Sequence, residues 1–226
     1  RNLLTVLTKT GCRFITTAVE SIDDEVLSRL DKGHTRSDFV EAVEIANRQG
    51  LTLSPTFIPF TPWTTVVQYR DLLQTIADLG MINHVAPVQL SIRLLIPIGS
   101  RMMELEEIKA HVQEFDNDAL SYPWNFSDPA VQDLENCVRM IVETGEQTGQ
   151  TRKQIFSRLW DAAHKADGAE MHKSINFFRT ENNLHVPRMS EPWYCCAEPN
   201  NRQVQQIWVQ TMARLLLLLP TTSYRV

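Results

Sequence analysis

Residues 11–35 read GCRFITTAVESIDDEVLSRLDKGHT, and this stretch decides the fold. Residues 12–19 form an apolar, β-branched run that ends in polar residues, which is typical of a strand buried on both faces. Ser21 or Asp23 can cap a short helix over residues 24–31. A buried strand followed at once by a helix predicts a βα unit.

The same alternation continues downstream. The pattern predicts a helix over 36–49 capped by Thr35, a strand over 51–58, a helix over 65–79 and a strand over 88–96, and residues 2–11 are consistent with a preceding helix. Three parallel strands can hardly cover both faces of a sheet or protect both edges. We therefore expect the α/β class, as a partial parallel βα-barrel that is cut from a longer protein or completed by another polypeptide.

The chain changes character after the third predicted strand. Asp128 and Pro129 predict the start of a helix that runs to about residue 144, and Thr151 predicts another that ends near Gly168. We expect three parts: the partial barrel over 1–110, a helical extension over 111–186, and over 187–226 a loop with adjacent cysteines followed by a terminal helix at 202–219.

Composition narrows the class of protein. The 226 residues are 43% hydrophobic and 22% charged with a net charge of -5, which predicts a globular protein without a basic surface for nucleic acid or anionic lipid. The longest apolar run, Leu215 to Leu219, is far shorter than the roughly 20 residues that cross a bilayer, and no signal peptide is recognisable. Four cysteines in a chain of this length favour reduced thiols, so a cytoplasmic location is expected.

Three polar residues stand out as candidate ligand-binding groups. Glu20 and Ser21 end the first predicted strand, at the edge where βα-barrels gather their sites, and Lys32 lies one short helix further on. A carboxylate and an ammonium on neighbouring loops can hold the two ends of a zwitterionic ligand. The alternative interpretation is a capping glutamate and a solvated lysine.

Several short motifs in a fixed order resemble the second half of the radical S-adenosylmethionine (radical SAM) core. The motifs are AVES followed by KGHT in residues 18–35, the segment FVEAVEIANRQGLTLSPTFIPFTPWTT, and SIRLLIPIGS at residues 91–100. The resemblance covers about residues 1–110. It departs from the family at Ala18, which replaces a glycine, and in FIPFTPWTT, which lacks the glycine and glutamate of the usual turn.

The resemblance implies a cofactor and a role for each candidate residue. Glu20 would accept the ribose hydroxyls of S-adenosylmethionine with Ser21 beside it, and Lys32 would bind the methionine carboxylate. Strand 51–58 would pass beneath the cofactor, and the backbone from Leu94 to Pro97 would flank the adenine. The family also needs a [4Fe–4S] cluster on a cysteine triad, which this sequence lacks, so the chain alone is expected to be inactive. The complete enzyme would act on an unknown small-molecule or peptide substrate with an electron-donor protein.

Cys195 and Cys196 are adjacent in the stretch EPWYCCAEPNN. A bond between them would be strained, because neighbouring Cα atoms lie about 3.8 Å apart whereas disulfides favour about 4.4–6.8 Å. The motif CCAEP resembles the tail of the CUAEP/CCAEP-tail radical SAM proteins, some of which carry selenocysteine at the position of Cys196. The resemblance implies a redox-active or metal-binding thiol pair, and the alternative is two small buried thiols in a surface loop.

The other candidate site residues are expected to have structural roles or leave the choice open. Two rival functions also remain. Cys12 and Cys137 are expected in the core, and His34 either contacts a ligand or stabilises its turn. One rival function is a non-catalytic α/β interaction module with an exposed sheet edge. The other is a barrel lyase or hydrolase that uses Glu20 and Lys32 as acid–base or Schiff-base residues.

Overall fold

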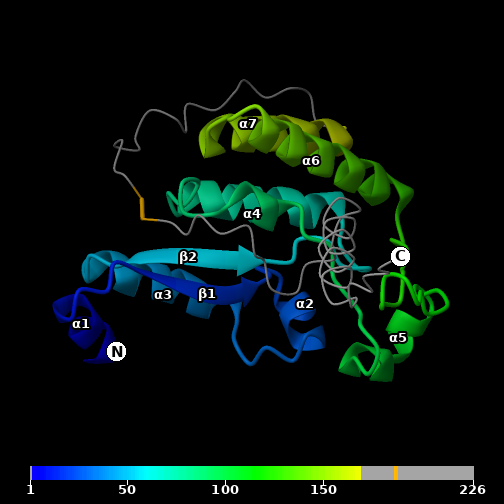
Figure 1. Cartoon of the computed structure of the whole chain (residues 1–226), viewed down its shortest axis with the longest axis horizontal. Helices are drawn as coiled ribbons and strands as arrows, with labels where there is room; N and C mark the ends of the chain where they lie inside the picture. Colours follow the sequence, from blue (N-terminus) through cyan, green and yellow to red (C-terminus); the bar gives the residue numbers. More distant parts are fainter. Residues whose placement is uncertain (1, 169–185, 188–226) are drawn as a thin grey trace, which may run out of the picture.

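The computed structural model describes residues 2–168 and 186–187 (Figure 1). Cys195, Cys196 and the expected terminal helix at 202–219 therefore lie outside the described residues. Strand β1 (Phe14–Glu20) and strand β2 (Thr52–Phe57) pair in parallel, with Phe14 opposite Thr52. Helices α2 (Asp24–Arg29) and α3 (Arg36–Arg48) connect them, which confirms the α/β class and the βα order.

The two faces of this sheet differ in burial. Paired residues of parallel strands point to the same side, so Ile15 and Thr17 share a face with Leu53 and Pro55. This face is packed, and the ring of Phe39 from α3 meets that of Phe57 edge-on at 5.9 Å. On the other face Thr16 and Ala18 are exposed and Ser54 and Thr56 are half-buried. The expectation that the first strand is buried on both faces is therefore wrong.

Capping residues define the helices much as the sequence predicts. Asp23 caps α2, and Thr35 caps α3 through a reciprocal pair of bonds with Asp38. Helix α4 (Val66–Asp78) begins in the same way at Thr65, and α1 is a short N-terminal helix (Asn2–Lys9). Each cap satisfies backbone N–H groups that the helix itself leaves open, so these helix starts follow from local chemistry.

The prediction of a third strand over residues 88–96 is wrong. The first half of this segment is the 3₁₀ helix η1 (Pro87–Leu90), and beyond it the described residues contain an isolated parallel bridge between Arg93 and Phe60 instead of a strand. The Gln89 side chain, 3% exposed, explains the difference, because its Oε1 accepts the N–H of Phe57 at 3.0 Å. A carbonyl of a third strand would otherwise bond there. The described residues thus form a sheet of two strands and show no partial barrel.

Helices α6 (Pro129–Gln147) and α7 (Arg152–Ala166) lie on the far side of α4 from the strands (Figure 1). Their buried residues belong to the same apolar core as the sheet and α4. Before them come the short helices η2 (Arg101–Glu104) and α5 (Glu106–Lys109).

Residues 111–127 then form antiparallel bridges rather than a helix, such as that of Val112 with Trp124. The helical part of the expected extension therefore starts at Pro129, and the three-part division itself remains a prediction. None of the helices in the described part of the chain is long and apolar enough to cross a membrane.

Gly145 on α6 should be the least tolerant glycine in the helical layer. A Cβ at this position would lie 2.5 Å from the side chain of Ile155 on α7. We expect Gly145→Ala to lower the free energy of unfolding by about 1–3 kcal/mol, because the overlap forces α6 and α7 apart. Urea denaturation measures the change. Thr144→Ala, at an exposed position next to it, serves as the control and should change stability by less than about 0.5 kcal/mol.

Candidate functional site

Strand β1 ends in an irregular turn at Glu20. A bulge interrupts the register between Ala18 and Glu20, and Glu20 has a φ of 65° in the left-handed region. A non-glycine residue there costs on the order of 1 kcal/mol, and it persists only where its surroundings hold it. Two hydrogen bonds do so: Ser21 N–H donates to the Val19 carbonyl at 2.8 Å, and Ile58 N–H donates to the Glu20 carbonyl at 2.8 Å.

Helix α2 ends so that Lys32 returns to this turn. Asp31 N–H donates to the Ser28 carbonyl at 3.0 Å and Lys32 N–H donates to the Leu27 carbonyl at 3.1 Å, the two bonds of a Schellman motif. Asp31 and Gly33 both have positive φ values, of 52° and 65°. The left-handed residues on either side of Lys32 reverse the chain and direct it back towards β1.

Glu20 and Lys32 form an ion pair at the carboxyl end of β1. Lys32 Nζ lies 2.9 Å from Glu20 Oε1, and the side chains are 33% and 7% exposed for the lysine and the glutamate, respectively. Within the described residues no hydrogen bond reaches the second carboxylate oxygen, Oε2. The pair therefore consists of a buried carboxylate that retains one open acceptor and a half-exposed ammonium with donors to spare.

His34 holds the same turn through its ring. Its Nε2 lies 3.0 Å from the Val19 carbonyl oxygen and its Nδ1 lies 3.2 Å from the Lys32 carbonyl oxygen. Of the two roles expected for this histidine, the structure shows the turn-stabilising one.

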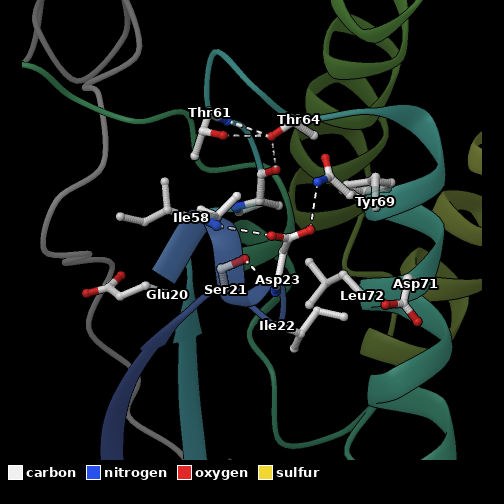
Figure 2. Close-up of a pocket in the computed structure, with 13 residues that line it drawn as sticks. Glu20, Ser21, Ile22, Asp23, Ile58, Thr61, Thr64, Tyr69, Asp71 and Leu72 are labelled. Carbon is white, nitrogen blue, oxygen red and sulfur yellow. Dashed lines mark hydrogen bonds between the residues drawn. The ribbon is translucent and has the colours of Figure 1, made fainter. Parts of the chain in front are cut away.

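A small cavity of about 30 Å³ opens at this strand end. Glu20 is among the residues that line this cavity, but in Figure 2 its carboxylate points away from Asp23 and from the hydroxyls of Thr61 and Thr64. Ser21 borders the cavity, and its Oγ accepts the N–H of Asp23 at 3.0 Å. The structure thus brings Glu20 and Lys32 together, whereas the Ser21 hydroxyl belongs to the helix start.

The polar groups of the cavity mostly bind one another. Gln68 Nε2 donates to Asp23 Oδ2 at 2.7 Å, and the Thr64 hydroxyl donates to the Pro59 carbonyl at 3.0 Å. Tyr69 donates its hydroxyl to the Leu90 carbonyl at 3.0 Å, and burial raises the pKa of Tyr69 far above its ordinary value, so the phenol stays protonated. The polar groups of these side chains are thus used in hydrogen bonds that stabilise the surrounding turns and helices.

Small and hydroxyl-bearing side chains lie on the exposed face of the sheet, next to the strand end that carries the ion pair. Thr16, Ala18 and Thr56 share this face, and Glu20 follows on the same strand. Sequence reasoning missed these small and hydroxyl-bearing residues as site candidates because it assigned both faces of the strand to the core. The signal that could have found them is the alternation of apolar Ile15 and Val19 with small or polar residues.

The remaining candidates have structural surroundings. Cys12 and Cys137 are partly buried against the core, as expected. Leu94, expected beside the adenine, is 5% exposed, and its carbonyl accepts the indole N–H of Trp124 at 2.7 Å. The described residues bring together no group of three or more histidine, cysteine or acidic side chains that could hold a metal ion.

Comparisons with known proteins assign no family to this site. No family model matches the chain, and a search of curated proteins finds no match.

A double-mutant cycle tests whether the ion pair contributes as a unit. We expect Lys32→Met to lower the free energy of unfolding by about 1–3 kcal/mol, since it leaves a buried carboxylate without its partner, and Glu20→Gln to abolish most of that penalty. Denaturant titration of both single variants and the double variant gives the coupling energy.

The pair Glu44 and Arg48 on α3, 3.7 Å apart and well exposed, provides the control cycle. Its coupling energy should stay below about 0.5 kcal/mol. Additive effects of Glu20→Gln and Lys32→Met would show that the two side chains do not interact in solution.

Proposed function

We propose that this chain is the C-terminal part of a radical SAM enzyme and that its Glu20 and Lys32 bind S-adenosylmethionine. The observation that carries the proposal is the contact of 2.9 Å between two side chains twelve positions apart, at the carboxyl end of a parallel strand. The motif resemblance assigns these same two residues to the cofactor. In this proposal the β1–β2 sheet is part of a βα-barrel that further strands complete.

The residues at the strand end fit the adenosyl part of the cofactor. Glu20 is 6% exposed and keeps Oε2 free of hydrogen bonds from the described residues, so it can accept a ribose hydroxyl without first losing Lys32. Lys32 can turn its ammonium towards the methionine carboxylate, because a third of its side chain is exposed. When bound, S-adenosylmethionine supplies a 5′-deoxyadenosyl group for hydrogen abstraction from the substrate.

The described residues do not fit the iron–sulfur cluster. Cys12 and Cys137 are the cysteines in this part of the chain, and neither belongs to a group of three candidate ligands. In this proposal the chain binds and orients the cofactor, and the cluster ligands are not among the described residues. For Cys195 and Cys196 we retain the proposal of a redox-active or metal-binding pair.

One structural feature favours a second candidate, a non-catalytic interaction module. Within the described residues β1 pairs only with β2, so its other edge presents unpaired backbone groups to a partner strand. This candidate does not require the ion pair to bind a ligand. The lyase or hydrolase alternative uses the same two side chains, and trapping of a carbonyl substrate on Lys32 with borohydride would support it.

Calorimetric titration separates these functions. We expect saturable binding of S-adenosylmethionine to the purified chain, weakened at least about tenfold by Glu20→Gln and by Lys32→Met, because each variant removes a charge-assisted bond to the ligand. 5′-Deoxyadenosine lacks the methionine carboxylate, so its binding should weaken with Glu20→Gln but not with Lys32→Met.

Glu44→Gln, on the exposed side of α3, is the matched control and should bind like the wild type. Absence of saturable binding, or equal affinity in the Glu20→Gln variant, would contradict the cofactor assignment.

A further inference from the structure

His34 joins the backbone segments that carry the two members of the ion pair. Val19, whose carbonyl lies 3.0 Å from Nε2, immediately precedes Glu20. The other ring nitrogen, Nδ1, lies 3.2 Å from the carbonyl of Lys32 itself. One ring therefore bridges strand β1 and the turn after α2, next to the point where their side chains meet.

The protonation state of the ring determines how many of these contacts are hydrogen bonds. Backbone carbonyl oxygens only accept, and a neutral imidazole has one N–H donor. The neutral ring can therefore donate to Val19 or to Lys32 but not to both. The doubly protonated ring donates to both carbonyls at the observed distances.

We propose that His34 is the positioning residue of this site: in its doubly protonated form it ties the backbone before Glu20 to the backbone of Lys32 and keeps their side chains in contact. This deepens the proposed function by naming what regulates the site. For the methionine carboxylate to bind Lys32, the ammonium must turn away from Glu20, and the loss of one tether makes that movement easier. Ligand access is then favoured when the ring loses its second proton.

Some charges around the His34 ring favour its doubly protonated form and others oppose it. Asp38 on α3 favours a positive ring, and bonds from the hydroxyl and N–H of Thr35, together with the charge of His34, lower the pKa of Asp38. The carboxylate of Glu20 acts in the same sense, whereas the ammonium of Lys32 opposes it.

The remaining charges near the turn have partners of their own. On α2, Asp24 Oδ1 accepts the backbone N–H of Arg36 at 2.7 Å, and the Arg36 guanidinium contacts Asp71 on α4 at 2.6 Å. The charged groups that remain to act on the ring are therefore Asp38, Glu20 and Lys32.

Pulsed acetylation of lysines, followed by mass spectrometry, measures how often Lys32 leaves Glu20. The reactivity of Lys32 is divided by that of exposed Lys9 in the same sample, which cancels the effect of pH on the reagent and on free amines. For the wild type we expect this ratio to rise about two- to tenfold between pH 5.5 and pH 8.5. This fold-change corresponds to the free energy of one lost hydrogen bond. In His34→Gln the ratio should be high and independent of pH.

His84→Gln is the matched control, because among the described residues the His84 ring contacts one carbonyl, that of Leu53 at 3.0 Å. It should keep the wild-type ratio and its pH dependence. A ratio that does not change with pH in the wild type would overturn the proposal, even if His34→Gln fails to fold. So would a folded His34→Gln protein that behaves like the wild type. The measurement uses no ligand, so its result is independent of whether S-adenosylmethionine binds.

Discussion

The left-handed backbone at Glu20 is the constraint on which the site depends. In a regular strand Glu20 would continue the alternation of β1, but the bulge after Ala18 places it opposite Phe57. The main-chain bonds of Ser21 and Ile58 hold this conformation, and the Schellman turn after α2 brings Lys32 to within 2.9 Å of the displaced carboxylate. The left-handed backbone costs less free energy than a buried carboxylate without a partner would. Because this backbone brings the carboxylate to Lys32, the ion pair offsets the cost of the strained conformation.

Among the described residues, helices cover one side of the sheet near this point. The packed face carries Leu53 and Phe57 against the helices, whereas the opposite face carries Thr16, Ala18 and Thr56. A face of small and hydroxyl-bearing residues gains little from burial in an apolar core. It suits contact with a polar ligand or with further protein, whereas the interaction-module alternative uses the edge of β1 that is unpaired within the described residues.

The sequence predicted the parts of this structure that short-range chemistry controls. Thr35 with Asp38 correctly marked the start of α3, and the rule that parallel strands gather sites at their carboxyl ends selected Glu20 and Lys32 as candidates, although their direct contact was not predicted. The third strand failed because Gln89, a residue without a strong preference in this pattern, takes the N–H of Phe57. The bulge at Glu20 and the bridging ring of His34 were not predictable either, since both depend on bonds between separate segments.

A crystal structure of the chain with 5′-deoxyadenosine and methionine would test the central claim most directly. The account predicts ribose hydroxyls within hydrogen-bonding distance of the Glu20 carboxylate, and Lys32 Nζ moved from Glu20 to the methionine carboxylate. Ligands bound elsewhere, with the contact between Glu20 and Lys32 unchanged, would contradict it.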